Sequence, residues 1–106
     1  CYNLTGHPIC GSNVTNMYGT YSNCYNLKAD ISYFYSHNVS NATDCFYGKN
    51  SSRRYHIHVP ANSITLNTFL KNNYRSIVGA PITWTNQGTY YYNATYNIYI
   101  YPNSSL

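Results

Sequence analysis

The chain has 106 residues, which is enough for one domain with a modest core. Only 8% of its residues are charged, whereas ordinary soluble domains have about 25%. The only two acidic residues leave little material for a carboxylate active site, and the six basic residues behind the net charge of +4 are scattered. We therefore expect neither an enzyme with a small-molecule substrate nor a nucleic-acid-binding protein.

Glycans are expected to replace charge as the coat that keeps the chain in solution. The sequence contains roughly twice as many Asn-x-Ser/Thr acceptors as chance would give, and none has proline in the middle position. Such a density predicts an extracellular protein, either secreted or displayed on a host cell or a virion. The predicted N-glycosylation sites are Asn3, Asn13, Asn38, Asn41, Asn50, Asn93 and Asn103.

All four cysteines lie in the first half of the chain, at Cys1, Cys10, Cys24 and Cys45. None has the spacing of a zinc site, so disulfides are favoured over metal binding or free thiols, and three pairings remain open. Cysteine at position 1 suggests a trimmed mature chain or an excised ectodomain. The longest apolar run is too short to cross a bilayer, so a membrane anchor would lie outside these residues.

The first half of the chain predicts short strands between polar loops. Residues 1–23 are expected to be irregular, 27–35 to form one or two strands, 37–43 an exposed loop and 45–47 a short strand. Residues 54–59 alternate, which places Tyr55, Ile57 and Val59 on one face of a strand.

The second half continues the pattern. We expect strands at 63–67, 74–78 and 81–85, with a bend at Gly79-Ala80, and then a hairpin of strands 89–92 and 96–101 around Asn93-Ala94-Thr95. In its last strand, Ile98 and Ile100 share one face, while Tyr99 and Tyr101 share the other. Residues 102–106 are predicted to begin a stalk or linker. Helix signals are almost absent, so the fold class is all-β in a single domain spanning residues 1–106.

The stretch Asn86-Gln87-Gly88-Thr89-Tyr90-Tyr91-Tyr92 resembles strand F of immunoglobulin-like domains, with Tyr92 in place of the cysteine. Tyr90 would take the tyrosine-corner position, and Tyr33 would take the place of the tryptophan of strand C. The resemblance implies an immunoglobulin-like β-sandwich with non-standard disulfides, in which Tyr33, Tyr90 and Tyr92 are buried.

Together with the dense acceptors, this pattern is similar to the virus-encoded immunoglobulin-like glycoproteins by which cytomegaloviruses and adenoviruses modulate immunity. The resemblance implies a host cell-surface or immune protein as partner, immune evasion by steric occupation of that partner, and no catalysis. The alternatives are a receptor-binding or structural domain of a viral attachment spike and a cellular adhesion or lectin-like module.

The candidate contact residues are basic or aromatic: Arg53, Arg54, Tyr55, His56, Tyr99 and Tyr101. Residues 53–92 contain no glycan acceptor, so we expect this segment to contribute a partner interface or a packing face toward another domain. His56 and His58 share a strand face at a spacing that metal sites use, but a solvated polar face is the favoured interpretation. We expect no metal and no cofactor apart from N-linked glycans.

Overall fold

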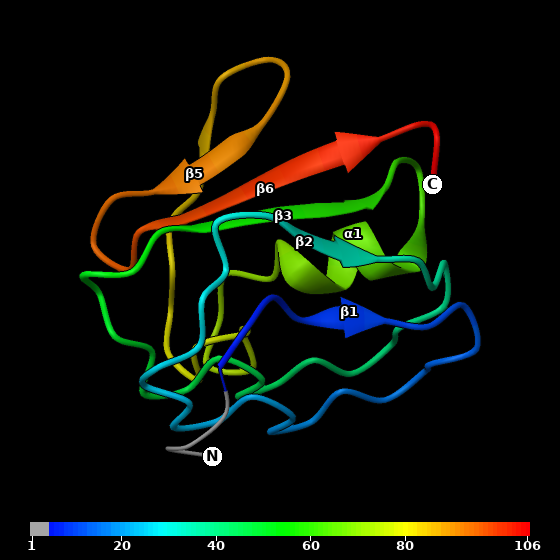
Figure 1. Ribbon diagram of the computed structural model, residues 1–106. Helices are drawn as coiled ribbons and strands as arrows, with labels where there is room; N and C mark the ends of the chain where they lie inside the picture. The colour runs from blue at the N-terminus through cyan, green and yellow to red at the C-terminus, as the bar shows by residue number, and fades with distance from the viewer. Residues whose placement is uncertain (1–4) are drawn as a thin grey trace.

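The computed structural model describes residues 5–106, whose strands form one six-stranded sheet in the order β1-β2-β3-β6-β5-β4 (Figure 1). β1, β2, β3 and β6 run parallel to one another, and β5 pairs antiparallel with both β6 and β4. The elements are β1 (Ile9–Cys10), β2 (Ser32–Phe34), β3 (Tyr55–Pro60), α1 (Ile64–Phe69), β4 (Thr85–Asn86), β5 (Tyr91–Asn93) and β6 (Ile98–Asn103).

The predicted β-rich class is confirmed, because strands predominate and α1 is the one helix of the described residues. The predicted immunoglobulin-like arrangement of two facing antiparallel sheets is not found in residues 5–106, where all strands belong to a single mixed sheet. β3 and β6 pair in parallel over six residues, and a parallel pair needs a long crossover connection. The segment between them supplies that crossover and contains α1, β4 and β5.

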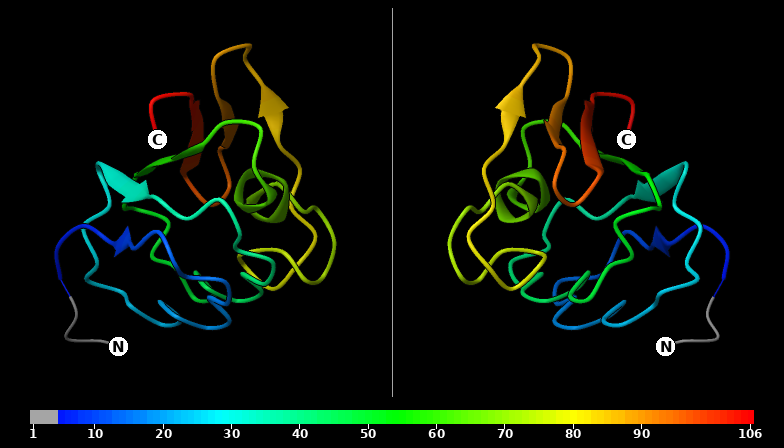
Figure 2. Two further views of the ribbon diagram at one scale, coloured as in Figure 1. Left: turned by 90° about the vertical axis from the view of Figure 1, so that its right-hand side faces the viewer. Right: turned by 90° about the vertical axis from the view of Figure 1, so that its left-hand side faces the viewer.

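The core lies between one face of the sheet and the segments packed beneath it. Residues on the inner faces of β3 and β6 are almost completely buried, as their alternation predicts: Tyr55, Ile57, Val59, Ile98 and Ile100. Figure 2 shows α1 and the loops of the first half of the chain on this side of the sheet. Three phenylalanines join the layers: Phe34 from β2, Phe69 from α1 and Phe46 from a turn, with 5.2 Å between the Phe34 and Phe69 ring centroids.

The predicted strand at 63–67 is wrong, because this segment begins the helix α1. The Ser63 hydroxyl accepts a hydrogen bond from the Leu66 N–H at 3.1 Å, which is the N-cap arrangement that starts a helix. The buried residues of α1 are Thr65, Thr68 and Phe69, at helical spacing. Alternation of Ile64 and Leu66 suggested a strand, but Ile64 is 53% exposed.

Three further predicted strands are also absent. Residues 45–47 form turns, and 74–78 form turns and bends, while only Thr85 of the segment 81–85 belongs to a strand. The predicted bend at Gly79 is confirmed, since its φ is +71°. A Cβ at this glycine would lie 2.0 Å from an Asp44 carboxylate oxygen, so a larger residue would displace that side chain and would also adopt a strained conformation.

The predicted disulfide framework does not form among the described cysteines. Cys10, Cys24 and Cys45 are buried free thiols, and Cys1 lies outside the described residues. The Cys10 Sγ donates to the neighbouring Gly11 carbonyl at 3.5 Å, and Cys24 makes a similar local contact to Ser22. Burial raises the pKa of the Cys10 and Cys45 thiols, which favours their neutral form as small apolar side chains of the core.

The predicted C-terminal hairpin is confirmed: β5 and β6 pair antiparallel around a turn at residues 94–97. Residues 102 and 103, which the sequence assigns to the start of a stalk, complete β6 beside the end of β3. No helix within residues 5–106 has the length and apolar character needed to span a lipid bilayer.

Candidate interaction surface

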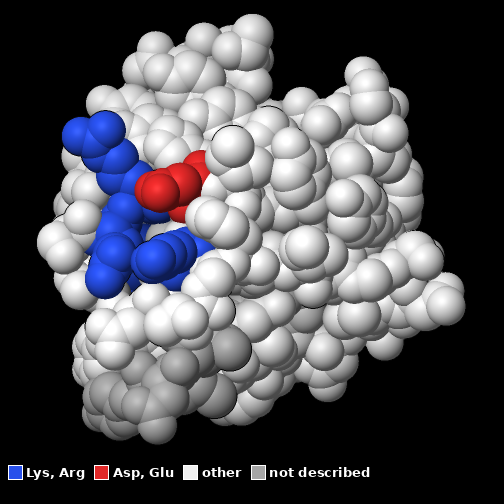
Figure 3. All heavy atoms as spheres, viewed as in Figure 1, with Lys and Arg blue, Asp and Glu red and all other residues white. Residues whose placement is uncertain are grey.

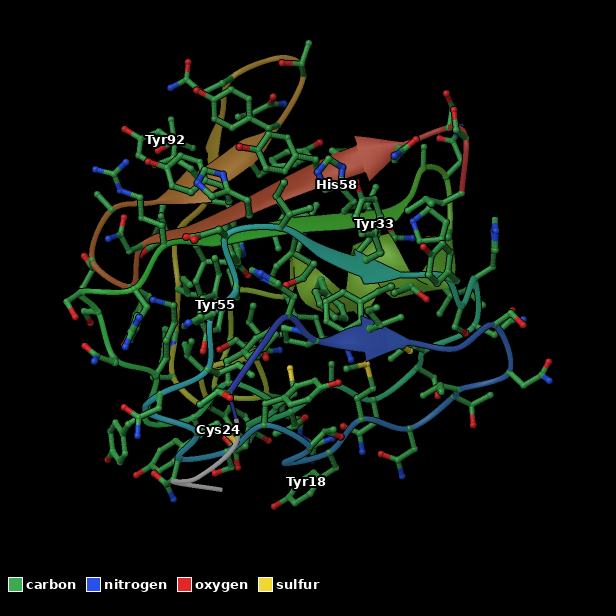
Figure 4. The ribbon with its side chains drawn as sticks, in the orientation of Figure 1. Tyr18, Cys24, Tyr33, Tyr55, His58 and Tyr92 are labelled. Carbon is green, nitrogen blue, oxygen red and sulfur yellow. The ribbon has the colours of Figure 1, made fainter. Side chains whose placement is uncertain are left out.

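The outer face of the sheet carries a continuous group of aromatic side chains, opposite the core. Within residues 5–106 no helix packs over this face, and Figure 4 shows Tyr33, His58 and Tyr92 along it while Tyr55 lies on the inner side. Seven of its members are half-buried against one another, and Tyr35 is 41% exposed. We define the aromatic face as Tyr33, Tyr35, His56, His58, Tyr90, Tyr92, Tyr99 and Tyr101.

Strand register arranges most of these rings in two rows across the sheet. In the first row His56 stacks on its register partner Tyr99, with centroids 4.6 Å apart, and Tyr99 stacks on Tyr92 at 5.7 Å. In the second row His58 lies 4.9 Å from both Tyr101 and Tyr33, again its register partners.

Two further tyrosines extend and join these rows. Tyr35 stacks on Tyr33 with 6.1 Å between the ring centroids. Tyr90 lies 6.0 Å from Tyr99 in the first row and 5.5 Å from Tyr101 in the second. The eight side chains therefore form one connected cluster over β2, β3, β5 and β6.

The rings of the two rows stand on edge and do not lie flat on the sheet. In the three closest pairs the ring planes differ by 15–18° at centroid distances of 4.6–4.9 Å, which matches the spacing of neighbouring strands, about 4.7–4.9 Å. Parallel rings this close cover one another's faces, because side-by-side rings in one plane would clash. The surface offered to solvent therefore consists of ring edges, tyrosine hydroxyls and imidazole nitrogens.

His56 and Tyr101 are also linked by a hydrogen bond of 2.7 Å between Nδ1 and the hydroxyl. Burial lowers the pKa of His56, an effect that Asp30 opposes and Arg54 strengthens. Burial and the nearby His56 lower the pKa of His58. Burial raises the pKa of the Tyr101 hydroxyl, with Tyr90 and Tyr99 adding to the shift. These shifts favour neutral imidazoles at His56 and His58 and a neutral phenol at Tyr101.

A charged edge borders the aromatic face where β3 begins. The basic and acidic side chains visible in Figure 3 gather there, and the rest of that view carries almost no charge. Arg54 precedes β3, and the His56 N–H donates to the Ala29 carbonyl at 2.8 Å, which brings Lys28 and Asp30 alongside. We define the basic edge as Lys28, Arg53 and Arg54.

Lys49 supports this edge from beneath and is not part of the exposed charge. Its ammonium donates to the carbonyl oxygens of Asn50, at 3.1 Å, and Arg53, and lies 4.4 Å from the centroid of the Tyr55 ring. Burial lowers the pKa of Lys49 to about 8. The side chain therefore fixes the turn that leads into β3.

The structure brings three predicted contact residues together, because His56, Tyr99 and Tyr101 are adjacent on the aromatic face. Arg53 and Arg54 lie beside it on the basic edge. The prediction for Tyr55 is wrong, since this side chain is only 2% exposed and packs on Phe46 in the core.

Three tyrosines that the sequence analysis missed as surface residues also belong to the aromatic face. Tyr33, Tyr90 and Tyr92 were expected in the core of a sandwich, but each is half-buried on the outer face. Their positions follow from the single sheet, in which Phe34 and Tyr91 point toward the core and their chain neighbours point away from it. The alternation around Phe34 could have indicated that Tyr33 lies on the outer face, because the chain neighbours of a core residue in a strand point away from the core.

The predicted glycan acceptors differ in how their side chains are held. Asn13 and Asn38 are exposed, Asn41, Asn50, Asn93 and Asn103 are half-buried, and Asn3 lies outside the described residues. The Asn93 amide nitrogen donates to the Thr83 carbonyl at 2.9 Å. Alternation along β6 places Asn103 on the same face as Tyr101, so a glycan there would border one end of the aromatic face.

His56 and His58 are both on the aromatic face, as their alternation predicts, and both are occupied with ring stacking. Among residues 5–106 there is no group of three or more histidine, cysteine or acidic side chains placed to hold a metal ion. The two histidines therefore do not lie on the solvated polar face that was expected, because they stack on half-buried tyrosines.

Comparison with known proteins finds no matching family model, curated protein or solved structure.

Proposed function

We propose that the chain is an extracellular, glycosylated recognition domain that binds an acidic protein surface through the aromatic face. The observation that carries the proposal is the cluster of eight tyrosine and histidine side chains, most of them stacked, on a sheet face that no helix covers within residues 5–106. Tyrosine is common at protein contacts because it buries a large area with few rotamers and has a polar tip. The stacking already orders these rings, so binding would sacrifice little side-chain entropy.

The basic edge favours an acidic partner. Lys28 and Arg54 are exposed there, and the chain has six basic residues against two acidic ones. Opposite charge on a partner would speed association and orient it across the aromatic face. The hydroxyl and imidazole tips beside the edge would then supply the short-range hydrogen bonds.

The ring geometry also argues for a protein over a single-stranded nucleic acid. Proteins that bind single strands offer open ring faces on which bases stack. In the closest pairs of the aromatic face, neighbouring rings cover those faces at 4.6–4.9 Å. Ring edges with polar tips suit the mixed apolar and polar surface of a folded protein better.

The partner class comes from the sequence resemblance: a host cell-surface or immune protein, whose surface the domain would occupy sterically on behalf of a virus. The alternative function, a receptor-binding or structural domain of an attachment spike, would use the same face. Both functions need a surface that glycans leave free. Four members of the aromatic face (His56, His58, Tyr90 and Tyr92) lie in the acceptor-free segment 53–92.

A glycan placed on the aromatic face would test the proposal. Tyr99→Asn combined with Tyr101→Thr creates an acceptor in the middle of the face, and the probe is an array of leukocyte surface ectodomains. We expect the unaltered glycosylated chain to capture at least one ectodomain and the new acceptor to abolish capture. In the control, Ile64→Thr creates an acceptor at Asn62, beside the helix on the inner side, and should leave capture unchanged.

Single substitutions would then locate the contact. Tyr92→Ala should weaken capture at least tenfold, and Arg54→Glu should slow association more at low salt than at high salt. Tyr47→Ala serves as a matched control, because Tyr47 is 51% exposed and lies outside the aromatic face. Capture that survives the glycan at position 99 would refute the proposed surface. An array that captures nothing would refute the leukocyte partner.

A further inference from the structure

A second surface feature lies away from the aromatic face. It is an open depression of about 570 Å³, within the range of about 300–1,000 Å³ that ligand pockets occupy. Tyr18 lines it, and in Figure 4 Tyr18 lies at the end of the molecule remote from Tyr33, His58 and Tyr92. The residues of the wall that matter here are Tyr18, Asn41, Asp44, Lys71, Tyr74 and Arg75.

One of these residues is a predicted glycan acceptor, and the fold holds it firmly. The Asn41 carbonyl accepts a hydrogen bond from the Met17 N–H at 2.7 Å, and Asn41 forms a parallel bridge with Asn16. Its side-chain oxygen accepts from the Thr43 N–H at 3.1 Å. The amide nitrogen, the atom to which a glycan would be joined, donates no hydrogen bond within the described part of the chain.

The pocket also offers aromatic surface of the kind that sugars contact. Tyr74 is 65% exposed and Tyr18 is 62% exposed, which makes them two of the most exposed large side chains of the described residues. The Arg75 guanidinium lies 5.4 Å from the centroid of the Tyr74 ring and helps to hold it. Asp44 adds a carboxylate that accepts hydrogen bonds, and Lys71 adds an ammonium that donates them, for hydroxyl and acetamido groups.

We propose that this pocket is the seat of the chain's own glycan, with the first N-acetylglucosamine on Asn41 packed between Tyr18 and Tyr74. The apolar C–H face of the sugar would cover tyrosine surface that is otherwise exposed, and its polar groups would reach Asp44 and Lys71. The covalent link gives the sugar a high effective concentration at the pocket, so a weak contact is sufficient. The glycan thereby becomes part of the folded surface.

Like the proposed function, this proposal requires the chain to be extracellular and glycosylated, but it does not depend on the aromatic face. Failure of partner binding would leave it intact. Asn13 and Asn38 provide internal controls, because both acceptors are exposed and neither lines this pocket. Asn93 is less suitable as a control, since its amide nitrogen is engaged with Thr83.

The experiment uses the chain secreted from cells that attach N-linked glycans. Glycopeptide mass spectrometry gives the occupancy of each acceptor, and a time course with peptide N-glycanase on the folded protein gives the release rate at each one. We expect Asn41 to be occupied and its glycan to be released at least tenfold more slowly than those on Asn13 and Asn38. The double substitution of Tyr18→Ala and Tyr74→Ala should remove that difference.

The thermal unfolding midpoint of the double variant should stay close to that of the original chain, because both tyrosines are exposed. Tyr74→Ser alone is a milder substitution that removes only one of the two rings. Removal of the Asn41 acceptor by Thr43→Ala should lower the midpoint in cells that glycosylate the chain but much less in cells that do not. An unoccupied Asn41, or release as fast as at Asn13 and Asn38, would overturn the proposal. Slow release that persists in both tyrosine variants would also overturn it.

Discussion

The two faces of β3 and β6 have different organisation although their residues alternate along the same strands. Apart from Tyr55, the inner face is aliphatic; it is fully buried, as at Ile57 and Ile100, and its neighbours come from α1 and distant turns. The outer face is aromatic and half-buried, and its rings pack on register partners from adjacent strands, as His56 does on Tyr99. Packing between layers thus fixes the inner face, whereas register within the sheet fixes the outer one.

The largest expected difference between the faces is in stability. Ile100→Ala should lower the free energy of unfolding by about 2–5 kcal/mol, because it leaves a cavity among fully buried neighbours. Tyr101→Ala, one position away on the outer face, should cost less, because solvent can fill the space and each lost ring contact contributes about 0.5–1.5 kcal/mol. Urea unfolding of both variants measures the contrast. A greater loss for Tyr101→Ala would mean that the outer stack, and not the core, dominates the stability of the sheet.

Much of this contrast could be predicted from the sequence, because alternation at 54–59 and 96–101 assigns inner and outer residues without knowledge of strand order. The strand order itself could not be predicted. Parallel pairing of β3 with β6 joins segments that are about forty residues apart, and no local signal specifies such a pairing. The resemblance of 86–92 to an immunoglobulin strand favoured buried tyrosines, whereas Tyr90 and Tyr92 stack on the outer face.

The candidate site was partly predictable for the same reason. His56, Tyr99 and Tyr101 could be proposed as contacts because each lies opposite an apolar residue on its strand. Tyr33 could not be added to them, because its place beside His58 depends on β2 lying next to β3. The helix α1 could not be predicted, because the short alternation of Ile64 and Leu66 indicated a strand. In the structure the N-cap hydrogen bond of Ser63 starts a helix at this point instead.

The cover of the inner face can be tested at Thr65 of α1. Its buried hydroxyl donates to the Ser36 carbonyl at 2.5 Å and accepts from the Val39 N–H at 3.0 Å. Thr65→Val keeps the shape but leaves both backbone groups unpaired, so we expect a loss of about 1–3 kcal/mol in the free energy of unfolding. Thr65→Ser keeps the hydroxyl and should be closer to the original chain. Equal losses for the two variants would assign the effect to packing and not to hydrogen bonding.

A smaller effect is expected from the hydrogen bond that links the two rows of the aromatic face. Tyr101→Phe removes the hydroxyl that contacts His56 Nδ1 at 2.7 Å, and a half-exposed bond of this kind contributes about 1 kcal/mol or less. Tyr99→Phe is the matched control, since the Tyr99 hydroxyl makes no hydrogen bond within residues 5–106. Thermal unfolding should show a lower midpoint for Tyr101→Phe than for Tyr99→Phe. Identical midpoints would show that stacking alone holds His56.

The smallest expected effect is a dependence of stability on pH that arises on the outer face alone. Burial lowers the pKa of His56 and His58 in the folded chain, with Asp30 opposing and Arg54 reinforcing the shift at His56. The unfolded chain therefore takes up protons near pH 6.5, while the folded chain takes them up only at lower pH. By linkage, the stabilisation from neutral imidazoles is fully present above about pH 6.5 and is lost as the pH falls through the folded pKa values.

The denaturation midpoint of the chain should therefore decrease between pH 7.5 and pH 5.5. In a double variant with His56→Gln and His58→Gln this decrease should be smaller, even if the variant is less stable at every pH. His37→Gln, in an exposed loop, serves as the control and should keep the original slope. An unchanged slope in the double variant would place the pH response elsewhere in the chain. A reduced slope would show that the stacked rows hold both histidines neutral, so the rings that form the proposed contact surface would gain positive charge only at the expense of the fold.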